Sequence, residues 1–201
     1  MLHLIGNGPQ PHKWTDMQLA RYLATLLSLL SGQRGQTLHF IRLDNKTIKL
    51  NCLCIKFGDL LKQSRPGSHL SEISLPVFTD NPRLCPVVLT REYLARTRDR
   101  RGQEKRLFIT NVRPYKAISR DTLRKWITCT LSESGIDTEL FGAHSTRSAS
   151  VSAAKVPLAT LLRTAGWSSD STFPDTLINL CGTNPRLLRV FSENLMKLLT
   201  V

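Results

Sequence analysis

The stretch Gly142-Ala143-His144-Ser145-Thr146-Arg147-Ser148-Ala149-Ser150 is the most informative part of this sequence. It holds His144 and Arg147 in the spacing H-x-x-R, which near a helix start places both side chains about one turn apart on one face. An arginine offers a planar pair of N–H donors to two oxygens of one phosphate, and a histidine adds a hydrogen bond or transfers a proton. The stretch therefore predicts a phosphodiester site. Because H-x-x-R often arises by chance, the prediction depends on the rest of the chain.

The charge of the whole chain agrees with an anionic partner. The 201 residues include 28 Lys and Arg against 15 Asp and Glu, a net charge of +13. A surplus of this size favours a polyanion as ligand, and nucleic acid is the commonest one. The alternative is a basic protein whose charge serves solubility alone. At 41% hydrophobic residues the chain can build a core, so wholesale disorder is not expected.

Several classes of protein are not expected. No apolar run approaches the ~20 residues of a membrane helix, and the N-terminus lacks the pattern of a secretory signal. The scattered cysteines contain no C-x-x-C, so we expect no zinc site, no disulfide framework, no cofactor and a reducing intracellular compartment. If Cys52 and Cys54 lie on a strand they share one face, and we interpret them as core packing. The five cysteines are Cys52, Cys54, Cys85, Cys129 and Cys181.

The hydrophobic spacing predicts a mainly α fold with a small antiparallel β-sheet. Thr15 and Gln18 form a capping box before apolar residues at helical spacing, and this helix should weaken at 31–32. Alternating residues predict two or three strands within about 40–78. Further helices are expected over Pro86–Asp99, Ser119–Gly135, Ser145–Lys155, Leu158–Ala165 and Arg186–Leu199. The predicted organisation is a loop-rich lead-in over 1–14, a domain over 15–180 and a C-terminal helix within 181–201.

Basic residues concentrate between Arg83 and Lys125. This segment contains 13 Lys and Arg and four acidic residues, a local charge of +9. A solvated helix face would have the same composition, but so few interleaved acids favour a surface that faces phosphates. The predicted DNA-binding residues are Arg96, Arg98, Arg100, Arg101, Lys105 and Arg106.

Six separated blocks carry a resemblance to a known family. They are LLSLLSGQRGQTLHFI, LLKQSRPGSHL, RLCPVVLTREYLARTRDRRGQEKRLFI, SRDTLRKWI, SGIDTELFGAHSTRSASVSAA and LLRTAGWSSDSTF, and they cover roughly residues 17–173. In this order they resemble the catalytic domain of the tyrosine recombinases, the phage-integrase superfamily. The similarity is greatest to the recombinases of Crypton- and DIRS-like mobile elements. The fold implied is the DNA breaking-rejoining core, which is mainly α with a small sheet.

The resemblance implies a set of residues around a phosphate of duplex DNA. Arg34 matches the first arginine of the family, Arg147 the second, and His144 the histidine. Trp167 matches the His/Trp position, whose indole N–H donates to a phosphate oxygen. The family's lysine belongs in the β-hairpin, where Lys62 is our first choice and Lys56 the second. From the residues alone, Arg34 could be a surface arginine at a helix end, Lys62 a solvated lysine and Trp167 a core residue.

The nucleophile of the family is missing. The family pattern places its tyrosine ten residues beyond the tryptophan, and that position is Leu177. All three tyrosines of the chain, Tyr22, Tyr93 and Tyr115, precede His144. Leucine has no nucleophilic atom, so we expect no covalent step there. The resemblance also ends after Phe173, as in a frameshifted, differently spliced or diverged gene.

The sequence therefore predicts a nuclear, integrase-like DNA-binding domain of mobile-element origin, associated with DNA recombination and DNA integration and unable to cleave by itself. Double-stranded DNA is the expected partner, with self-association or a recombinase partner also possible and no membrane involved. One alternative is an active or assisted recombinase whose nucleophile comes from another subunit. Another is a degenerate element product without a cellular role.

Overall fold

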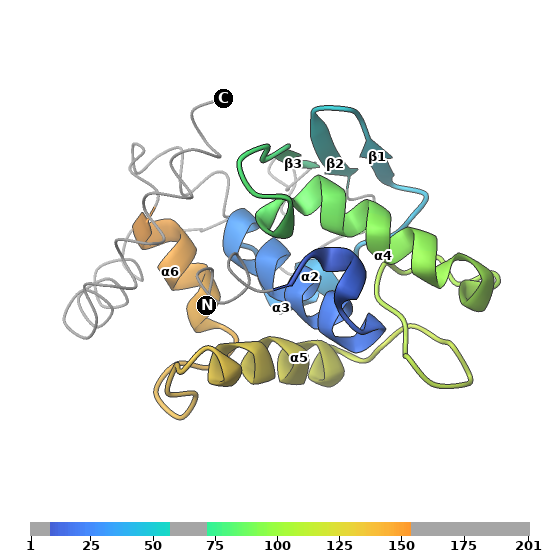
Figure 1. The fold of residues 1–201 in the computed structure, drawn as a ribbon. Coiled ribbons are helices and arrows are strands. Elements are labelled where there is room, and N and C mark those ends of the chain that lie inside the picture. The colour runs from blue at the N-terminus through green and yellow to red at the C-terminus, as the bar shows by residue number, and fades with distance from the viewer. Residues whose placement is uncertain (1–8, 57–71, 154–201) are drawn as a thin grey trace, which may run out of the picture.

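The computed structural model describes residues 9–56 and 72–153, and these residues form helices around a central helix with a small sheet at one side (Figure 1). The helices are η1 (Pro11–Lys13), α2 (Asp16–Ser31), α3 (Gly35–His39), η2 (Pro82–Leu84), α4 (Pro86–Arg101), α5 (Arg120–Glu133) and α6 (Ser145–Ala153). The strands are β1 (Lys46–Ile48), β2 (Cys52–Lys56) and β3 (Glu72–Pro76).

Helix α2 lies at the centre, and α4, α5 and α6 pack around it. The predicted capping box starts it: the Thr15 N–H donates to Gln18 Oε1 at 2.9 Å, and the Gln18 N–H donates to Thr15 Oγ1 at 3.2 Å. Its apolar side chains, including Leu19 and Leu23, are fully buried. Gly32 ends the helix with φ 59°, a left-handed conformation that glycine adopts without steric cost. The chain can therefore turn sharply toward α3.

The three strands form an antiparallel sheet in the order β1-β2-β3, as the alternation predicts. Leu53 and Ile55 of β2 face the core, each 1% exposed. Cys52 and Cys54 therefore lie on the opposite face, and the interpretation of this pair as core packing was wrong. The predicted alternation had also placed Leu50 within a strand, whereas it lies in the β1–β2 turn. A period of two does not by itself say which set of residues faces inward.

The predicted helices that fall within the described residues are present. Ser119 caps α5 by accepting the Thr122 N–H at 3.1 Å, and Gly135 follows it with φ 75°. The short helix α3 was not predicted, because five residues are too few for a helical period to show. The predicted helices over Leu158–Ala165 and Arg186–Leu199 lie outside the described residues, as does the predicted boundary at 180. The mainly α fold with a small antiparallel sheet is confirmed.

The described end of the predicted lead-in is part of the folded core. Trp14 is buried and meets the Tyr22 ring edge-on, with centroids 5.0 Å apart. Arg96 of α4 donates to the carbonyl oxygens of Trp14 and Pro11 at 2.6 and 3.0 Å. These contacts fasten residues 11–14 to α4.

Candidate phosphate-binding site

Arg34 lies just beyond the C-terminal end of α2. The left-handed Gly32 turns the chain, Gln33 is buried after it, and Arg34 then precedes the first turn of α3 with extended backbone angles. The Arg34 carbonyl accepts the Leu38 N–H at 3.2 Å, which fixes the backbone, while its side chain is exposed. The turn therefore presents a guanidinium group at this end of the molecule.

His144 and Arg147 lie at the start of α6. The His144 carbonyl accepts the Arg147 N–H at 3.2 Å, so His144 precedes the first turn and Arg147 lies within it. The imidazole of His144 is exposed and rests over Gly142: a Cβ at position 142 would lie 3.3 Å from its Nδ1. The glycine leaves room for the ring in this position. His144 is exposed just before α6, whereas Arg147 is buried in its first turn.

A buried hydrogen bond ties these two regions together. Ser28 Oγ in the last turns of α2 and Thr146 Oγ1 in the first turn of α6 are 2.7 Å apart, although 118 residues separate them. Thr146 Oγ1 also donates to the Ala143 carbonyl at 2.8 Å. Figure 1 shows α6 beside the C-terminal end of α2. Because Arg34 follows α2 and Arg147 follows Thr146, this contact holds the two chain segments that carry the arginines near each other.

The electrostatics of Arg147 reflect this proximity. The Arg147 residue is only 8% exposed, and burial is the main cause that lowers its pKa to about 10. The positive charge of Arg34 lowers the pKa of Arg147 further. Arg147 remains protonated at neutral pH, so two cations share the site at an energetic cost. A bound anion between them would offset this cost, and a phosphate has the oxygens to accept from both.

Of the remaining residues predicted for this site, the structure describes only Lys56. Lys56, the second choice for the hairpin lysine, is exposed at the end of β2. Lys62, Trp167 and the nucleophile position Leu177 lie outside the described residues. Among the described residues, no group of three or more His, Cys, Asp or Glu could hold a metal ion. In the same part of the chain, no helix is long and apolar enough to cross a membrane.

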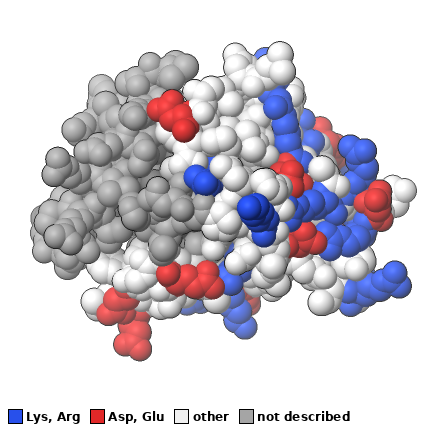
Figure 2. All heavy atoms as spheres, viewed as in Figure 1, with Lys and Arg blue, Asp and Glu red and all other residues white. Residues whose placement is uncertain are grey.

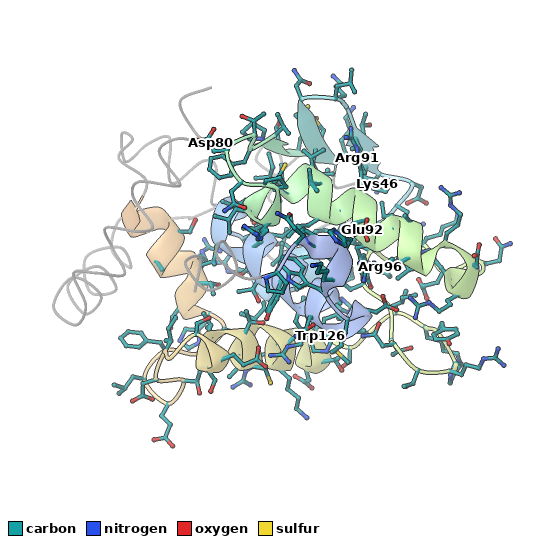
Figure 3. All side chains as sticks on the ribbon, in the orientation of Figure 1. Lys46, Asp80, Arg91, Glu92, Arg96 and Trp126 are labelled. Carbon is teal, nitrogen blue, oxygen red and sulfur yellow. The ribbon has the colours of Figure 1, made fainter. Side chains whose placement is uncertain are left out.

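Two of the predicted DNA-binding arginines of α4 make ion pairs within the protein. Arg96 and Glu92 lie side by side on α4 (Figure 3) and form an ion pair at 2.7 Å. Arg96 also contacts Asp16 at 3.4 Å. Arg100 bonds to Asp16 at 2.6 Å, and its guanidinium carbon lies 5.8 Å from the centre of the Tyr115 ring. Both guanidinium groups therefore fasten the start of α2 and the segment before it to α4.

Arg101 is buried and also makes contacts within the protein. Its guanidinium group donates to the carbonyl oxygens of Arg106 and Leu107 and to Thr97 Oγ1, and it lies over the Tyr93 ring at 5.9 Å. Burial is the main cause that lowers the pKa of Arg101. These contacts hold the segment after α4 against the helix, so the Arg101 guanidinium faces the interior.

The other members of the predicted cluster are more open to solvent. Arg98 and Lys105 are exposed, and Lys105 Nζ lies 3.6 Å from Asp44. Arg106 is half-buried over the Phe40 ring, 4.6 Å from its centre. Figure 2 shows Lys and Arg gathered over α4 and the segment after it, with acidic side chains among them. The predicted cluster thus divides into structural arginines and a smaller exposed set.

Sequence reasoning missed the Ser28–Thr146 contact. The available signal was Ser28 itself, a polar residue inside the apolar run Leu26-Leu27-Ser28-Leu29-Leu30. A hydroxyl in such a position needs a buried partner. The sequence could not say that the partner is a threonine 118 residues away.

Comparisons with known proteins identify the fold. No protein-family model and no curated protein matches the sequence. The structure is similar to the XerH site-specific recombinase bound to palindromic difH substrate in a post-cleavage complex, with 15% identity and a TM-score of 0.63, over 95% of this chain and 49% of that chain. A pre-cleavage complex of XerH with difH substrate gives 14% identity and a TM-score of 0.63, over 90% of this chain and 49% of that chain. The XerA recombinase gives 14% identity and a TM-score of 0.57, over 93% and 64%.

These similarities establish the architecture. The chain spans about half the length of the XerH chains that it matches. The present chain has the fold of the part of the XerH site-specific recombinase and of the XerA recombinase that it matches. The fold class that the sequence predicts is therefore confirmed, at a sequence identity that establishes the fold alone.

Proposed function

We propose that this chain is a tyrosine-recombinase-like domain that binds duplex DNA and grips one backbone phosphate between Arg34 and Arg147. The observation that carries the proposal is the buried Ser28–Thr146 hydrogen bond, which holds the start of α6, where Arg147 lies, against the end of α2, after which Arg34 follows. The positive charge of Arg34 accordingly lowers the pKa of Arg147. A fold gains little stability from bringing a cation to a buried cation. A site for an anion gives the arrangement a purpose.

The other residues complete the proposed phosphate site. The two arginines donate to the non-bridging oxygens, and the exposed His144 imidazole adds a donor one helical turn from Arg147. By the resemblance to the tyrosine recombinases, Lys62 or Lys56 and Trp167 belong to the same set. XerH is solved with its DNA substrate before and after cleavage, which supports DNA as the ligand of the similar fold.

The exposed basic residues contribute a second, less specific attraction. Arg98 and Lys105 are free of the buried carbonyl contacts that engage Arg101, so they are the members of the cluster best placed to meet phosphates. Such contacts supply affinity without reading sequence. We therefore propose strongly salt-dependent and weakly sequence-selective binding.

Strand cleavage is not part of the proposed function. Leu177 occupies the position of the nucleophilic tyrosine, and without a nucleophile the phosphate is held and not attacked. We propose further that the domain derives from a Crypton- or DIRS-like mobile element, acts in the nucleus, and retains its role in DNA recombination through binding. Self-association or pairing with an active recombinase would place the bound DNA in a recombination complex.

The test joins a binding assay to a covalent-capture assay on a nicked suicide substrate. Arg34→Ala and Arg147→Ala are each expected to weaken duplex binding by roughly 1–3 kcal/mol, as for one charge-assisted contact. Lys13→Ala is the charge-matched control, because the exposed Lys13 lies at the opposite end of α2, a 16-residue helix about 24 Å long. If all three variants lose the same amount of DNA affinity, the two arginines contribute only through general charge attraction, and the proposed phosphate site is wrong.

Covalent capture tests the missing nucleophile. The unmodified protein should form no adduct with the suicide substrate, whereas Leu177→Tyr restores a hydroxyl at the position that the family pattern gives to its tyrosine. We expect at most trace cleavage from this variant, because a nucleophile misplaced by ~1 Å loses on the order of a hundredfold in rate. An adduct from the unmodified protein, alone or mixed with a partner recombinase, would instead assign the chain to the active or assisted recombinases.

A further inference from the structure

The outer face of the sheet carries two thiols in contact. Cys52 and Cys54 alternate along β2 with the buried Leu53 and Ile55, so both cysteines project from the face opposite the core. Their Sγ atoms are 3.3 Å apart. Both side chains are half-buried, which leaves the pair within reach of small reagents. Core packing does not account for this pair, and the proposed phosphate site does not use it.

The strands on either side hold the pair in place. Cys54 is the register partner of Thr47 on β1 and of Ser74 on β3, and its Sγ lies 3.7 Å from Ser74 Oγ. The contact with Cys52 is the main cause that raises the pKa of Cys54. Two thiols held in contact on a central strand should form a disulfide with each other rapidly once one of them has reacted, because the second thiol is already next to the first.

We propose that Cys52 and Cys54 form a dithiol modification site, oxidised to an intrastrand disulfide by a small disulfide such as glutathione disulfide and reopened by thiols. One cysteine thiolate attacks a sulfur of glutathione disulfide, so a mixed disulfide forms and one glutathione thiolate leaves. The second cysteine then attacks the protein sulfur of the mixed disulfide and expels the second glutathione. The protein loses two electrons and two protons, and glutathione disulfide gains them as two thiols.

Strand geometry makes this bond reversible. Residues i and i+2 of a strand have Cα atoms about 6.6 Å apart, near the upper end of the roughly 4.4–6.8 Å range that disulfides bridge. Closure therefore shortens β2 locally, against the ladders that it makes with β1 and β3. Disulfides formed under such constraint are the readily reduced ones, which suits a regulatory modification. The Cys52 thiol and Glu72 of β3 both raise the pKa of Cys54, so the attacking thiolate forms more readily, and closure should accelerate, as the pH increases.

The experiment treats the folded protein with glutathione disulfide, blocks the remaining thiols by alkylation and maps the tryptic peptides by mass. Cleavage after Lys49 and Lys56 yields the peptide Leu50–Lys56, LNCLCIK, which contains only these two cysteines. We expect this peptide to lose about 2 Da, as an internal disulfide requires. The exposed Cys129 should carry only bound glutathione, and the buried Cys85 should stay unmodified. Dithiothreitol should restore both thiols.

Two further samples keep the proposal open to contradiction. Cys54→Ser should trap Cys52 as a stable mixed disulfide with glutathione, because no second thiol completes the exchange. Protein unfolded in urea should close the bond more slowly than folded protein, since the strand no longer fixes the thiols. The proposal is overturned if Leu50–Lys56 stays reduced or carries only glutathione while Cys129 reacts, or if unfolding does not slow closure.

Discussion

Arg147 combines burial with a neighbouring positive charge, which is an unfavourable environment for a guanidinium group. Burial and Arg34 both lower its pKa, so the folded protein bears a cost at this residue at neutral pH. Functional sites often carry such costs, because a residue arranged for its ligand is not arranged for stability. We therefore expect the charges of this site to disfavour folding while they favour binding of DNA.

Arg34→Ala should separate these effects. The substitution removes the positive charge that lowers the pKa of Arg147. It removes no capping hydrogen bond, because the exposed Arg34 side chain makes none to α3. We expect the melting temperature to stay the same or rise by a few degrees at most. Duplex binding should weaken by about tenfold, the equivalent of about 1.4 kcal/mol. Calorimetry and a fluorescence binding titration check the two results, and a clear loss of stability would make Arg34 a structural residue.

His39 provides a test of pH dependence. Its Nε2 contacts the Ile118 carbonyl at 2.9 Å, and burial lowers the pKa of His39, with further lowering by the charges of Arg106 and Arg120. The folded protein therefore binds a proton at His39 less readily than the unfolded chain, whose histidine titrates near pH 6.5. The contribution of His39 to stability is complete above about pH 6.5 and is lost as the pH falls below that value.

Urea unfolding at about pH 7.5 and pH 5.5 measures this dependence for the wild-type protein and His39→Gln. The wild-type free energy of unfolding should decrease more over this interval than that of the variant, whose amide does not titrate. Equal decreases in the two proteins would mean that protonation of His39 costs the fold nothing.

At the scale of elements, the site depends on how α6 docks against α2. The Ser28–Thr146 contact lies inside the interface, where a hydroxyl without a partner is costly. The contact fixes the start of α6, which contains Arg147, against the end of α2, after which Arg34 follows. A change in this contact should therefore act on stability and on phosphate binding together.

Thr146→Val keeps the shape of the side chain and removes its hydroxyl. We expect the free energy of unfolding to fall by about 1–3 kcal/mol, because the Ser28 hydroxyl is left without its buried partner, and DNA binding to weaken as Arg147 is less well fixed. Denaturant unfolding measures the first effect. The double variant Ser28→Ala/Thr146→Val should recover part of the stability, since no hydroxyl at position 28 then lacks a partner. Full additivity of the two changes would contradict the coupling.

Elements also mark where sequence reasoning succeeded. The capping box at Thr15, the cap at Ser119 and the glycines after α2 and α5 are local signals, and each fixes a helix end within a few residues. The prediction of which face of β2 points inward was wrong, because alternation gives two equivalent faces. Whether Cys52 or Leu53 is buried depends on the elements that pack against the sheet. Local chemistry predicted the boundaries, whereas tertiary contacts decided orientation.

At the scale of the whole molecule, charge composition predicted an anionic partner but not which arginines would face it. Arg96, Arg100 and Arg101 have the same composition signal as Arg98, yet the first three bind carbonyl oxygens or Asp16 inside the protein. The resemblance predicts that Arg34 and Arg147 share one site, and the Ser28–Thr146 contact holds the two chain segments that carry them against each other. Net charge therefore does not say which of the cations a ligand can reach.

This division of the arginines leads to a prediction about salt. Arg98→Gln/Lys105→Gln removes two exposed charges, and the pairing of Lys105 with Asp44 at the surface contributes little to stability. The melting temperature should stay unchanged. In a plot of log K for duplex DNA against log salt concentration, the slope should become shallower by about 0.9 for each phosphate that the variant no longer neutralises. Lys13→Gln, at the far end of α2, should leave the slope unchanged. If the double variant keeps the wild-type slope, these residues face solvent in the complex, and the proposed DNA surface must lie elsewhere on the molecule.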